Sequence, residues 1–522
     1  MKKIIAILAI LLASASLGVT LTPSTSAEPA RVRLGNEMLM GRYHYLIEGK
    51  KVGLVTNQSG VDSQGRSVID ILSTDKTITL AALYGPEHGI DGTAGAGAYV
   101  ESYVHPKLGI PVYSLYGKTR MPAADMLQGI DALVFDIQDI GARTYTYMST
   151  LNYCMVAAQK YGKPIIVLDR PNPLGGETVD GPVLEDSYET FVGVDNLPMA
   201  HGMTAGELAL FFNRNIGASL TVVPMEGYTR NMTYQDTGLQ WVQTSPNIPG
   251  LDSVFGYMAT GLGEGTGIFQ ADKFRWIGGK GIDAGSFAAL LNSAKLPGVN
   301  FIPEFRGDAG GVRLKITDYH TFNPARTGIY ALAYARSLNN FTVPKSGETL
   351  VMFDKIMGTG QIGRYLEAGL SPQQIEAEYA PGLTRFREER KNYLIYGNSP
   401  LQEPVANSPV SVLVDSIPVN FDSAPYIDSN SRLMVPLRAI SEALGAQVRW
   451  DERSRTVTIS RPGSTAVFRI DSTSAALNGQ PQKMDTCPVI RKDRTMVPVR
   501  YVGEYLGAEV NWDPVTRTVS IY

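Results

Sequence analysis

The N-terminal part of the chain alternates short apolar runs with longer helical patterns, and this alternation constrains the fold more than any other feature. The runs are rich in Val, Ile and Leu, which is typical of strands that are buried on both faces. Helical patterns follow some of them, at residues 144–161 and 204–213. This order predicts an α/β fold with a parallel, doubly wound sheet. The predicted strands are Lys51–Thr56, Ile78–Tyr84, Ala132–Ile137, Pro164–Leu168 and Leu220–Pro224.

Polar residues follow four of these predicted strands at the points where the strands end. The segments are NQSG at 57–60, GPEHGIDG at 85–92, QDIGARTYTY at 138–147 and DRPNPLGG at 169–176. The carboxyl ends of parallel strands lie along one edge of a sheet, and ligands bind there in folds of this kind. Carboxylates, imidazole, guanidinium groups, phenols and amides are therefore expected at one rim, as a polar substrate rich in hydroxyl groups requires.

The same segments carry a family resemblance, together with two more motifs further along the chain. In order they read GLVTNQSG (53–60), GPEHG (85–89), FDIQDIGARTYTY (135–147), LDRPNPLGG (168–176), LPMAHGMTAGEL (197–208) and SPNIP (245–249). With these motifs in collinear order, residues 28–398 resemble the NamZ-like exo-β-N-acetylmuramidases. The resemblance implies a Rossmann-like subdomain, an ancillary subdomain and an active-site cleft between them. It also implies release of N-acetylmuramic acid from the non-reducing end of peptidoglycan fragments.

The chain departs from the family pattern at two places near the expected cleft. Family members usually continue GPEHG with Phe-Arg-Gly, whereas this chain has Ile90-Asp91-Gly92. The later Glu-Gly-Arg-Gly-Thr pattern is replaced by Glu264-Gly265-Thr266-Gly267-Ile268. Two arginines that the resemblance leads us to expect are therefore absent, which puts the substrate preference in question but not the reaction.

Glycoside hydrolysis needs a proton donor at the leaving oxygen and, across the sugar ring, a second carboxylate or an assisting group. We predict Glu87 as the general acid because it follows a buried strand, where burial disfavours the charged carboxylate. A capping or loop carboxylate is the alternative. His88 would either orient Glu87 or pack against the backbone. Glu264 is predicted as the second group, although its glycine neighbours also suit a mobile loop; the alternatives are Asp136, Asp139 and the substrate's own acetamido group.

N-Acetylmuramic acid differs from N-acetylglucosamine by a lactyl carboxylate, and arginine is the usual bidentate partner of a carboxylate. Arg143 is the predicted partner and Arg170 the second choice, although each could instead form an ion pair inside the protein. Tyr145 and Tyr147 would stack on a pyranose face. The remaining predicted substrate contacts are Asn57, Asp139, Asn172, His201 and Asn247; a turn role for Asn172 and a purely structural role for His201 are the alternatives.

The first residues predict export. Lys2 and Lys3 precede an apolar run at 4–12, and Thr25-Ser26-Ala27 forms a small-residue cleavage site, so residues 1–27 read as a signal peptide. An uncleaved anchor is disfavoured because the apolar run is about half of the roughly 20 residues that span a bilayer. We expect a secreted or cell-wall-associated, extracytoplasmic protein without a membrane span after cleavage. The predicted units are a catalytic subdomain at 28–225, an α+β ancillary subdomain at 226–398 and a linker at 399–408.

The C-terminal part contains an internal repeat. Residues 432–460 and 494–522 are identical at 16 of 29 positions, and each unit reads as strand, helix and two strands around a Trp-Asp turn. Residues 409–522 resemble the copper amine oxidase N-terminal-like, or stalk, domain. The name implies no copper here because the segment has no histidine. Attachment to cell-wall material and a role as a spacer remain equal interpretations.

Charge and histidine placement limit the other function classes. The net charge is −3 with acids and bases interspersed, which gives no electrostatic case for nucleic acid. No G-x-G-x-x-G follows the first strand, so nucleotide binding is disfavoured, and we expect no cofactor and no metal. The runner-up function is a metal-dependent deacetylase of cell-wall glycans using His88, Asp91 and His201. A non-catalytic cell-wall-binding protein is the third alternative.

Overall fold

The computed structural model describes residues 31–398 and 411–522, apart from 416, 420, 429–431, 493 and 514–517. The predicted signal peptide and linker lie outside the described residues. Within them, no helix combines the length and the apolar character needed to cross a membrane.

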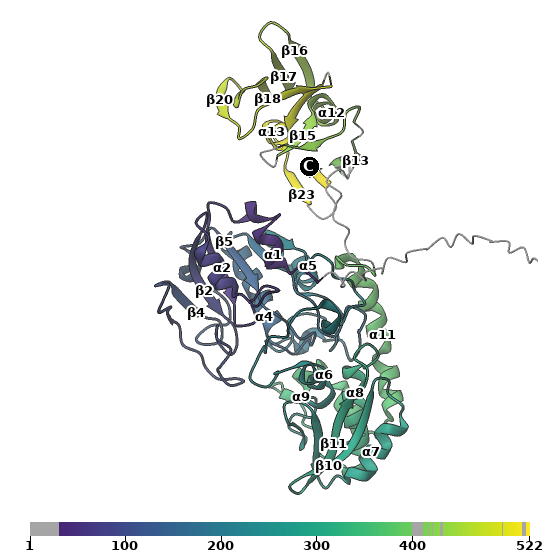
Figure 1. The fold of residues 1–522 in the computed structure, drawn as a ribbon. Coiled ribbons are helices and arrows are strands. Elements are labelled where there is room, and N and C mark those ends of the chain that lie inside the picture. Colours follow the sequence, from purple (N-terminus) through teal and green to yellow (C-terminus); the bar gives the residue numbers. More distant parts are fainter. Residues whose placement is uncertain are drawn as a thin grey trace, which may run out of the picture.

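A seven-stranded sheet forms the N-terminal part, in the order β3-β4-β2-β1-β5-β6-β7. Strands β2, β4 and β5 of this sheet are labelled in Figure 1. Neighbouring strands from β4 to β7 run parallel, and only the edge strand β3 is antiparallel. The order from β4 to β7 is that of a Rossmann-type sheet, which confirms the predicted fold class. The strands are β1 (Lys51–Thr56), β2 (Thr79–Gly85), β3 (Tyr103–Val104), β4 (Pro111–Ser114), β5 (Ala132–Asp136), β6 (Ile165–Leu168) and β7 (Leu220–Val223).

Helices cover both faces of this sheet, as continuous apolar strands require. In β5, Leu133 and Phe135 pack into one core, whereas Ala132 and Val134 pack into the other. The first core includes α4 (Tyr147–Lys160) and α5 (Ala205–Ile216), and the second includes α1 (Gly35–Met40) and α2 (Val68–Thr74). The strand order reverses between β1 and β5. The rim next to this switch point is where a ligand crevice is expected.

The ancillary part has a four-stranded antiparallel sheet of order β10-β11-β9-β8. Its strands are β8 (Ile268–Ala271), β9 (Trp276–Lys280), β10 (Val299–Arg306) and β11 (Ala309–Ile316). Its helices are α6 (Leu251–Thr260), α7 (Ala284–Ser293), α8 (Pro324–Asn339), α9 (Met352–Met357), α10 (Gln361–Glu367) and α11 (Pro372–Arg390).

The last of these helices contains a proline in its interior. Despite this residue, α11 continues through Pro381 to Arg390. Leu383 and Phe386, which follow the proline, are both buried in the core. Tertiary packing therefore outweighs the backbone hydrogen bond that a proline removes from a helix.

The two C-terminal repeats form matching elements. Each has a strand ending in Val-Pro, a short helix and two further strands, and the first strands of the two repeats pair with each other in antiparallel orientation. The elements of the first repeat are β15 (Leu433–Pro436), α12 (Leu437–Ala443), β16 (Gln447–Asp451) and β17 (Thr456–Arg461). Those of the second are β22 (Arg494–Pro498), α13 (Val499–Tyr505), β23 (Val510–Asp513) and β24 (Thr518–Ile521).

Candidate active site

Glu87 lies in the turn that follows β2, and both of its carboxylate oxygens accept hydrogen bonds. The Gly97 backbone N–H donates to Oε1 at 2.8 Å, and the Thr146 hydroxyl donates to Oε2 at 2.5 Å. Thr146 precedes α4, so the contact ties the β2 turn to the segment after β5. The side chain is 9% exposed. Glu87 is therefore fixed in position yet still reaches the surface, as a proton donor to a bound substrate must.

His88 shapes the loop beside Glu87 and makes no hydrogen bond to it among the described residues. Its Nδ1 lies 2.7 Å from the carbonyl oxygen of Ala94, and the Ala94 N–H donates back to the His88 carbonyl. The residue has a φ of 73°, a left-handed conformation that is strained for a side chain of this size. The contacts agree with the backbone-packing alternative for His88, and its orienting role stays a prediction.

Three tyrosines form one wall next to Glu87. The rings of Tyr145 and Tyr147 meet edge to face at 4.8 Å, and Tyr257 of α6 packs on Tyr145 at 5.8 Å. The hydroxyls of Tyr145 and Tyr147 donate to Thr244, to its hydroxyl and its carbonyl respectively. Burial, together with the charges of Glu87 and Asp139, raises the pKa of Tyr257 to about 12. The edge-to-face packing leaves Tyr145 and Tyr147 largely enclosed, so their predicted stacking on a sugar stays a prediction.

The turn after β1 brings amide groups to the same rim. Asn57 Oδ1 accepts from the Ser59 N–H and hydroxyl at 2.9 and 2.6 Å, while its Nδ2 is buried without a partner among the described residues. Gln138 donates to the carbonyls of Asp139 and Pro171, and its Oε1 is likewise unpartnered. Unpaired buried polar atoms are rare in folded proteins. Their presence here fits a rim that receives a polar ligand.

The guanidinium group of Arg170 is not available to a substrate. Its guanidinium binds Asp136 through Nε–Oδ1 at 2.5 Å and Nη2–Oδ2 at 3.0 Å, and Nη2 also donates to the Val61 carbonyl. Both side chains are almost completely buried. The prediction of a substrate contact at Arg170 is corrected: this residue neutralises Asp136 under the rim, which also makes Asp136 unsuitable as a second catalytic carboxylate.

Arg143 is also a structural residue. Its Nη1 donates to the carbonyls of Pro182 and Leu197 at 2.9 and 2.8 Å, and Nη2 donates to the carbonyl of Ile356 in α9 at 2.7 Å. The residue is 3% exposed, and burial lowers the pKa of Arg143 to about 9. The predicted lactyl contact is corrected because the side chain is enclosed, and it links the Rossmann-like part to the ancillary part.

Asp139, Asn172 and His201 lie together below the rim. Asp139 Oδ2 accepts from the Gly141 N–H at 2.8 Å and lies 3.7 Å from His201 Nε2, while its Oδ1 has no partner among the described residues. Asn172 shapes its own turn by accepting from the Leu174 N–H and donating to the Met203 carbonyl. All three side chains are buried. Asn172 thus has the turn role that was the alternative, and substrate contacts for Asp139 and His201 stay predictions.

Glu264 and Asn247 are exposed, unlike the residues above. Glu264 lies between α6 and β8 and forms no hydrogen bond or ion pair within the described part of the chain. The structure therefore does not join it to Glu87, and its catalytic role remains a prediction, as does the substrate contact of Asn247.

Sequence reasoning missed two residues that contact Glu87 or lie near it, Thr146 and Tyr116. Thr146 stands between the two tyrosines that were singled out, and its position next to a predicted strand end was the available signal. Tyr116 follows β4, a strand that was not predicted because only half of its four residues are buried. Burial and the charge of Glu87 raise the pKa of Tyr116, while Arg120 lowers it.

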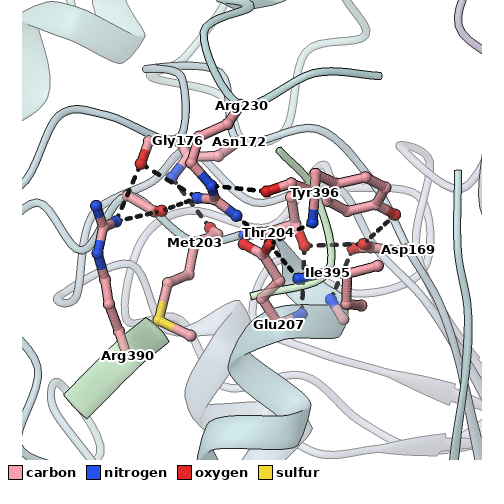
Figure 2. Close-up of polar contacts among 12 residues, drawn as sticks. Asp169, Asn172, Gly176, Met203, Thr204, Glu207, Arg230, Arg390, Ile395 and Tyr396 are labelled. Carbon is pink, nitrogen blue, oxygen red and sulfur yellow. Dashed lines mark hydrogen bonds and ion pairs between the residues drawn. The ribbon is translucent and has the colours of Figure 1, made fainter. Parts of the chain in front are cut away.

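A buried polar network joins the segment after β6 to α5 and to the segment after α11 (Figure 2). Asp169, the residue after β6, accepts from the hydroxyls of Thr204 and Tyr396 at 2.8 and 2.7 Å and from the Gly206 N–H at 2.6 Å. Glu207 of α5 forms an ion pair with Arg230 and accepts from the N–H of Ile395. Burial raises the pKa of Asp169 to about 7. The network fastens the chain segment after α11 to the sheet.

Glu87 lines neither of two cavities in the described part of the chain. The larger one, about 470 Å³, lies between residues 182–185 and helices α10 and α11, and none of the predicted site residues lines it. The smaller one, about 30 Å³, is lined by Ser59, Gln138 and Arg170 and has room for about one water molecule. Within the described ranges, no group of three His, Cys, Asp or Glu side chains comes together as a metal site. His88, Asp91 and His201 therefore form no such group.

Fold and site together give an α/β protein with a carboxylic acid fixed at the carboxyl edge of a Rossmann-like sheet, and a glycoside hydrolase needs such a group as its proton donor. Comparison with family models gives the family. Residues 52–252 match the N-terminal and residues 255–396 the C-terminal part of "Exo-beta-N-acetylmuramidase NamZ". The chain belongs to this family and is an exo-acting glycoside hydrolase. Residues 413–521 match "Copper amine oxidase N-terminal domain".

Three individual proteins are similar to this chain. The peptidoglycan β-N-acetylmuramidase NamZ of Bacillus subtilis (strain 168) is 43% identical over 388 residues, 71% of this chain and 93% of that protein. A crystal structure of a DUF1343 family protein from Bacteroides fragilis NCTC 9343 has a TM-score of 0.64 at 36% identity, covering 70% of this chain and 99% of that one. A protease inhibitor of Brevibacillus choshinensis is 27% identical over 114 residues, which span 22% of this chain and 34% of that protein.

Proposed function

We propose that this enzyme releases N-acetylmuramic acid from the non-reducing end of peptidoglycan fragments, outside the cytoplasmic membrane. The observation that carries the proposal is Glu87, a carboxylic acid fixed by Thr146 and the Gly97 N–H at the rim of the sheet. The relative from Bacillus subtilis is named as a peptidoglycan β-N-acetylmuramidase, and 93% of its length is matched. The apolar N-terminal segment that reads as a signal peptide supports action outside the membrane.

Glu87 is the general acid in this proposal. Each of its oxygens accepts one hydrogen bond, so a lone pair or a proton remains available at the exposed edge. The acid protonates the glycosidic oxygen of the leaving sugar as the bond to C1 breaks. The hydroxyl of Thr146 and the N–H of Gly97 keep the carboxyl group aimed at this oxygen, which removes the need to order it in the transition state.

The observed contacts reduce the number of candidates for the second catalytic group, which acts opposite the acid. Asp136 is bound to Arg170, and Asp139 is enclosed below the rim. The exposed Glu264 and the substrate's own acetamido group remain as candidates. Replacing the acetamido group by a trifluoroacetamido group weakens it as a nucleophile. Turnover should fall strongly if the acetamido group assists, and it should change little if Glu264 acts.

The C-terminal domain holds the enzyme near its substrate in this proposal, by attachment to cell-wall material. Its support is the resemblance to stalk domains and the internal repeat of residues 432–460 and 494–522. Retention of the isolated segment 409–522 on washed cell walls is the corresponding assay. A segment that stays in solution would leave only the role of a spacer.

The test of the whole proposal is product analysis. The mature protein is incubated with a disaccharide of N-acetylmuramic acid β-linked to N-acetylglucosamine, and with the disaccharide in which the order of the sugars is reversed. We expect free N-acetylmuramic acid from the first substrate and no cleavage of the second, as read by mass spectrometry. Cleavage of the second substrate alone, or of neither, would refute the proposal.

A further inference from the structure

Arg120 is an arginine near the acid that neither the predictions nor the family assignment singles out. It follows β4, and its guanidinium carbon lies 4.6 Å from the ring centroid of Tyr116 and 4.4 Å from that of Phe191. The two rings are themselves in contact, with centroids 5.9 Å apart, and Tyr153 of α4 packs on Phe191 at 5.3 Å. Aromatic stacking occupies the face of a guanidinium and leaves its N–H donors at the edge available.

No acidic partner uses those donors. Arg120 forms no hydrogen bond or ion pair with any residue in the part of the chain that the structure describes, and its side chain is exposed. Arg143 and Arg170 differ in this respect, because Nη1 and Nη2 of Arg143 donate to three backbone carbonyls and the guanidinium of Arg170 is paired with Asp136. Arg120 is therefore a cation that aromatic stacking positions and whose N–H donors are available to a ligand.

Tyr116 places this cation close to the acid. The charge of Glu87 acts on the Tyr116 hydroxyl, and the charge of Arg120 acts on the same group with the opposite sign. Tyr116 thus contacts the guanidinium of Arg120 through its ring and lies near the general acid. In N-acetylmuramic acid the bond to be cleaved is at C1 and the lactyl ether is at C3. A residue that binds the lactyl carboxylate must therefore lie about one sugar ring away from the acid.

We propose that the Arg120 guanidinium, stacked on Tyr116 and Phe191, binds the lactyl carboxylate and gives the enzyme its selectivity for N-acetylmuramic acid. This inference rests on the proposed function. The stacked arrangement orders the side chain before the substrate binds, which reduces the entropy that binding would otherwise cost. An N-acetylglucosaminide, which lacks the carboxylate, gains nothing from this residue.

The test compares ligands that differ only in charge. Calorimetry measures the binding of N-acetylmuramic acid and of its lactyl methyl ester to the wild type, Arg120→Ala, Arg120→Lys and Lys118→Ala. Lys118 is the matched control, an exposed cation two positions away in the same loop. The wild type should prefer the acid over the ester roughly ten- to hundredfold, as a charge-assisted hydrogen bond predicts. Arg120→Ala should reduce this ratio to about one, Arg120→Lys should retain part of it, and Lys118→Ala should leave it unchanged.

A chromogenic N-acetylmuramide, tested on the wild type alone, separates this inference from the proposed function. Hydrolysis together with an acid-to-ester ratio that survives in Arg120→Ala would overturn the role of Arg120 and leave the function intact. Absence of both hydrolysis and binding in the wild type would overturn both. Thermal unfolding shows whether Arg120→Ala folds. If it does not fold, the acid-to-ester binding ratio of Arg120→Lys tests the role of Arg120 instead.

Discussion

Replacing Arg143 by methionine should destabilise the enzyme without changing its sugar selectivity. The variant leaves the carbonyls of Pro182 and Ile356 without the donor that Arg143 supplies, whereas the Leu197 carbonyl keeps the N–H of Leu184. An unsatisfied buried acceptor costs about 1–3 kcal/mol, so the two together cost roughly 2–6 kcal/mol. Part of this loss is offset because the variant no longer buries a charge, an effect seen in the lowered pKa of Arg143. We expect the free energy of unfolding to fall by ~3 kcal/mol, near the lower end of that sum.

Urea denaturation measures this loss, with Arg364→Met as the control. Arg364 is exposed on α10, so its replacement should change the free energy of unfolding by no more than about 0.5 kcal/mol. The folded fraction of Arg143→Met should keep its muramide activity and the wild-type preference for N-acetylmuramic acid over its lactyl methyl ester. A variant of normal stability that loses only its muramide activity would refute the structural role and restore Arg143 as the lactyl contact.

Two further changes test other parts of the structure. Asp169→Asn should change how stability depends on pH: the pKa of Asp169 is raised from 3.8 to about 7 in the fold, so its contribution is complete below about pH 4 and is lost as the pH rises through 7. The wild type should therefore lose stability relative to Asp169→Asn between pH 4 and pH 7 in urea titrations, and parallel pH profiles would contradict this. Deleting residues 399–522 should leave the turnover of soluble fragments within a few-fold of the full chain, because the C-terminal repeats pack into their own core. A folded truncation that is inactive on soluble fragments would show that these repeats complete the site.

Periodicity predicted the sheet well because its strands are buried on both faces. The bounds of β1 coincide with the predicted apolar run, and those of β6 differ by a single residue. The four-residue β4 escaped prediction because its alternating burial gives no continuous apolar run. Tyr116 and Arg120 follow that strand, and they were not predicted for the same reason.

The site was predictable as a place but not as a set of contacts. The rule that functional residues follow the ends of parallel strands correctly placed Glu87 and Asn57 at one rim of the sheet. The same rule failed for Arg143, whose acceptor carbonyls lie 39, 54 and 213 positions away in the sequence. A local pattern cannot show which way a side chain turns when its partners are this distant. Arg170 failed for a similar reason, since its carboxylate belongs to a neighbouring strand.

The central claim is that Glu87 protonates the leaving group of a muramide, and Glu87→Gln tests it most directly. The amide has nearly the same shape but carries no acidic proton, and general acid catalysis contributes roughly 10²–10⁴-fold. Turnover of the unactivated disaccharide should fall by that factor, while a chromogenic muramide with a good leaving group should be partly spared. Glu101→Gln, an exposed glutamate between β2 and β3, serves as the control and should retain full activity. Near-normal turnover of the unactivated disaccharide by Glu87→Gln would contradict the account.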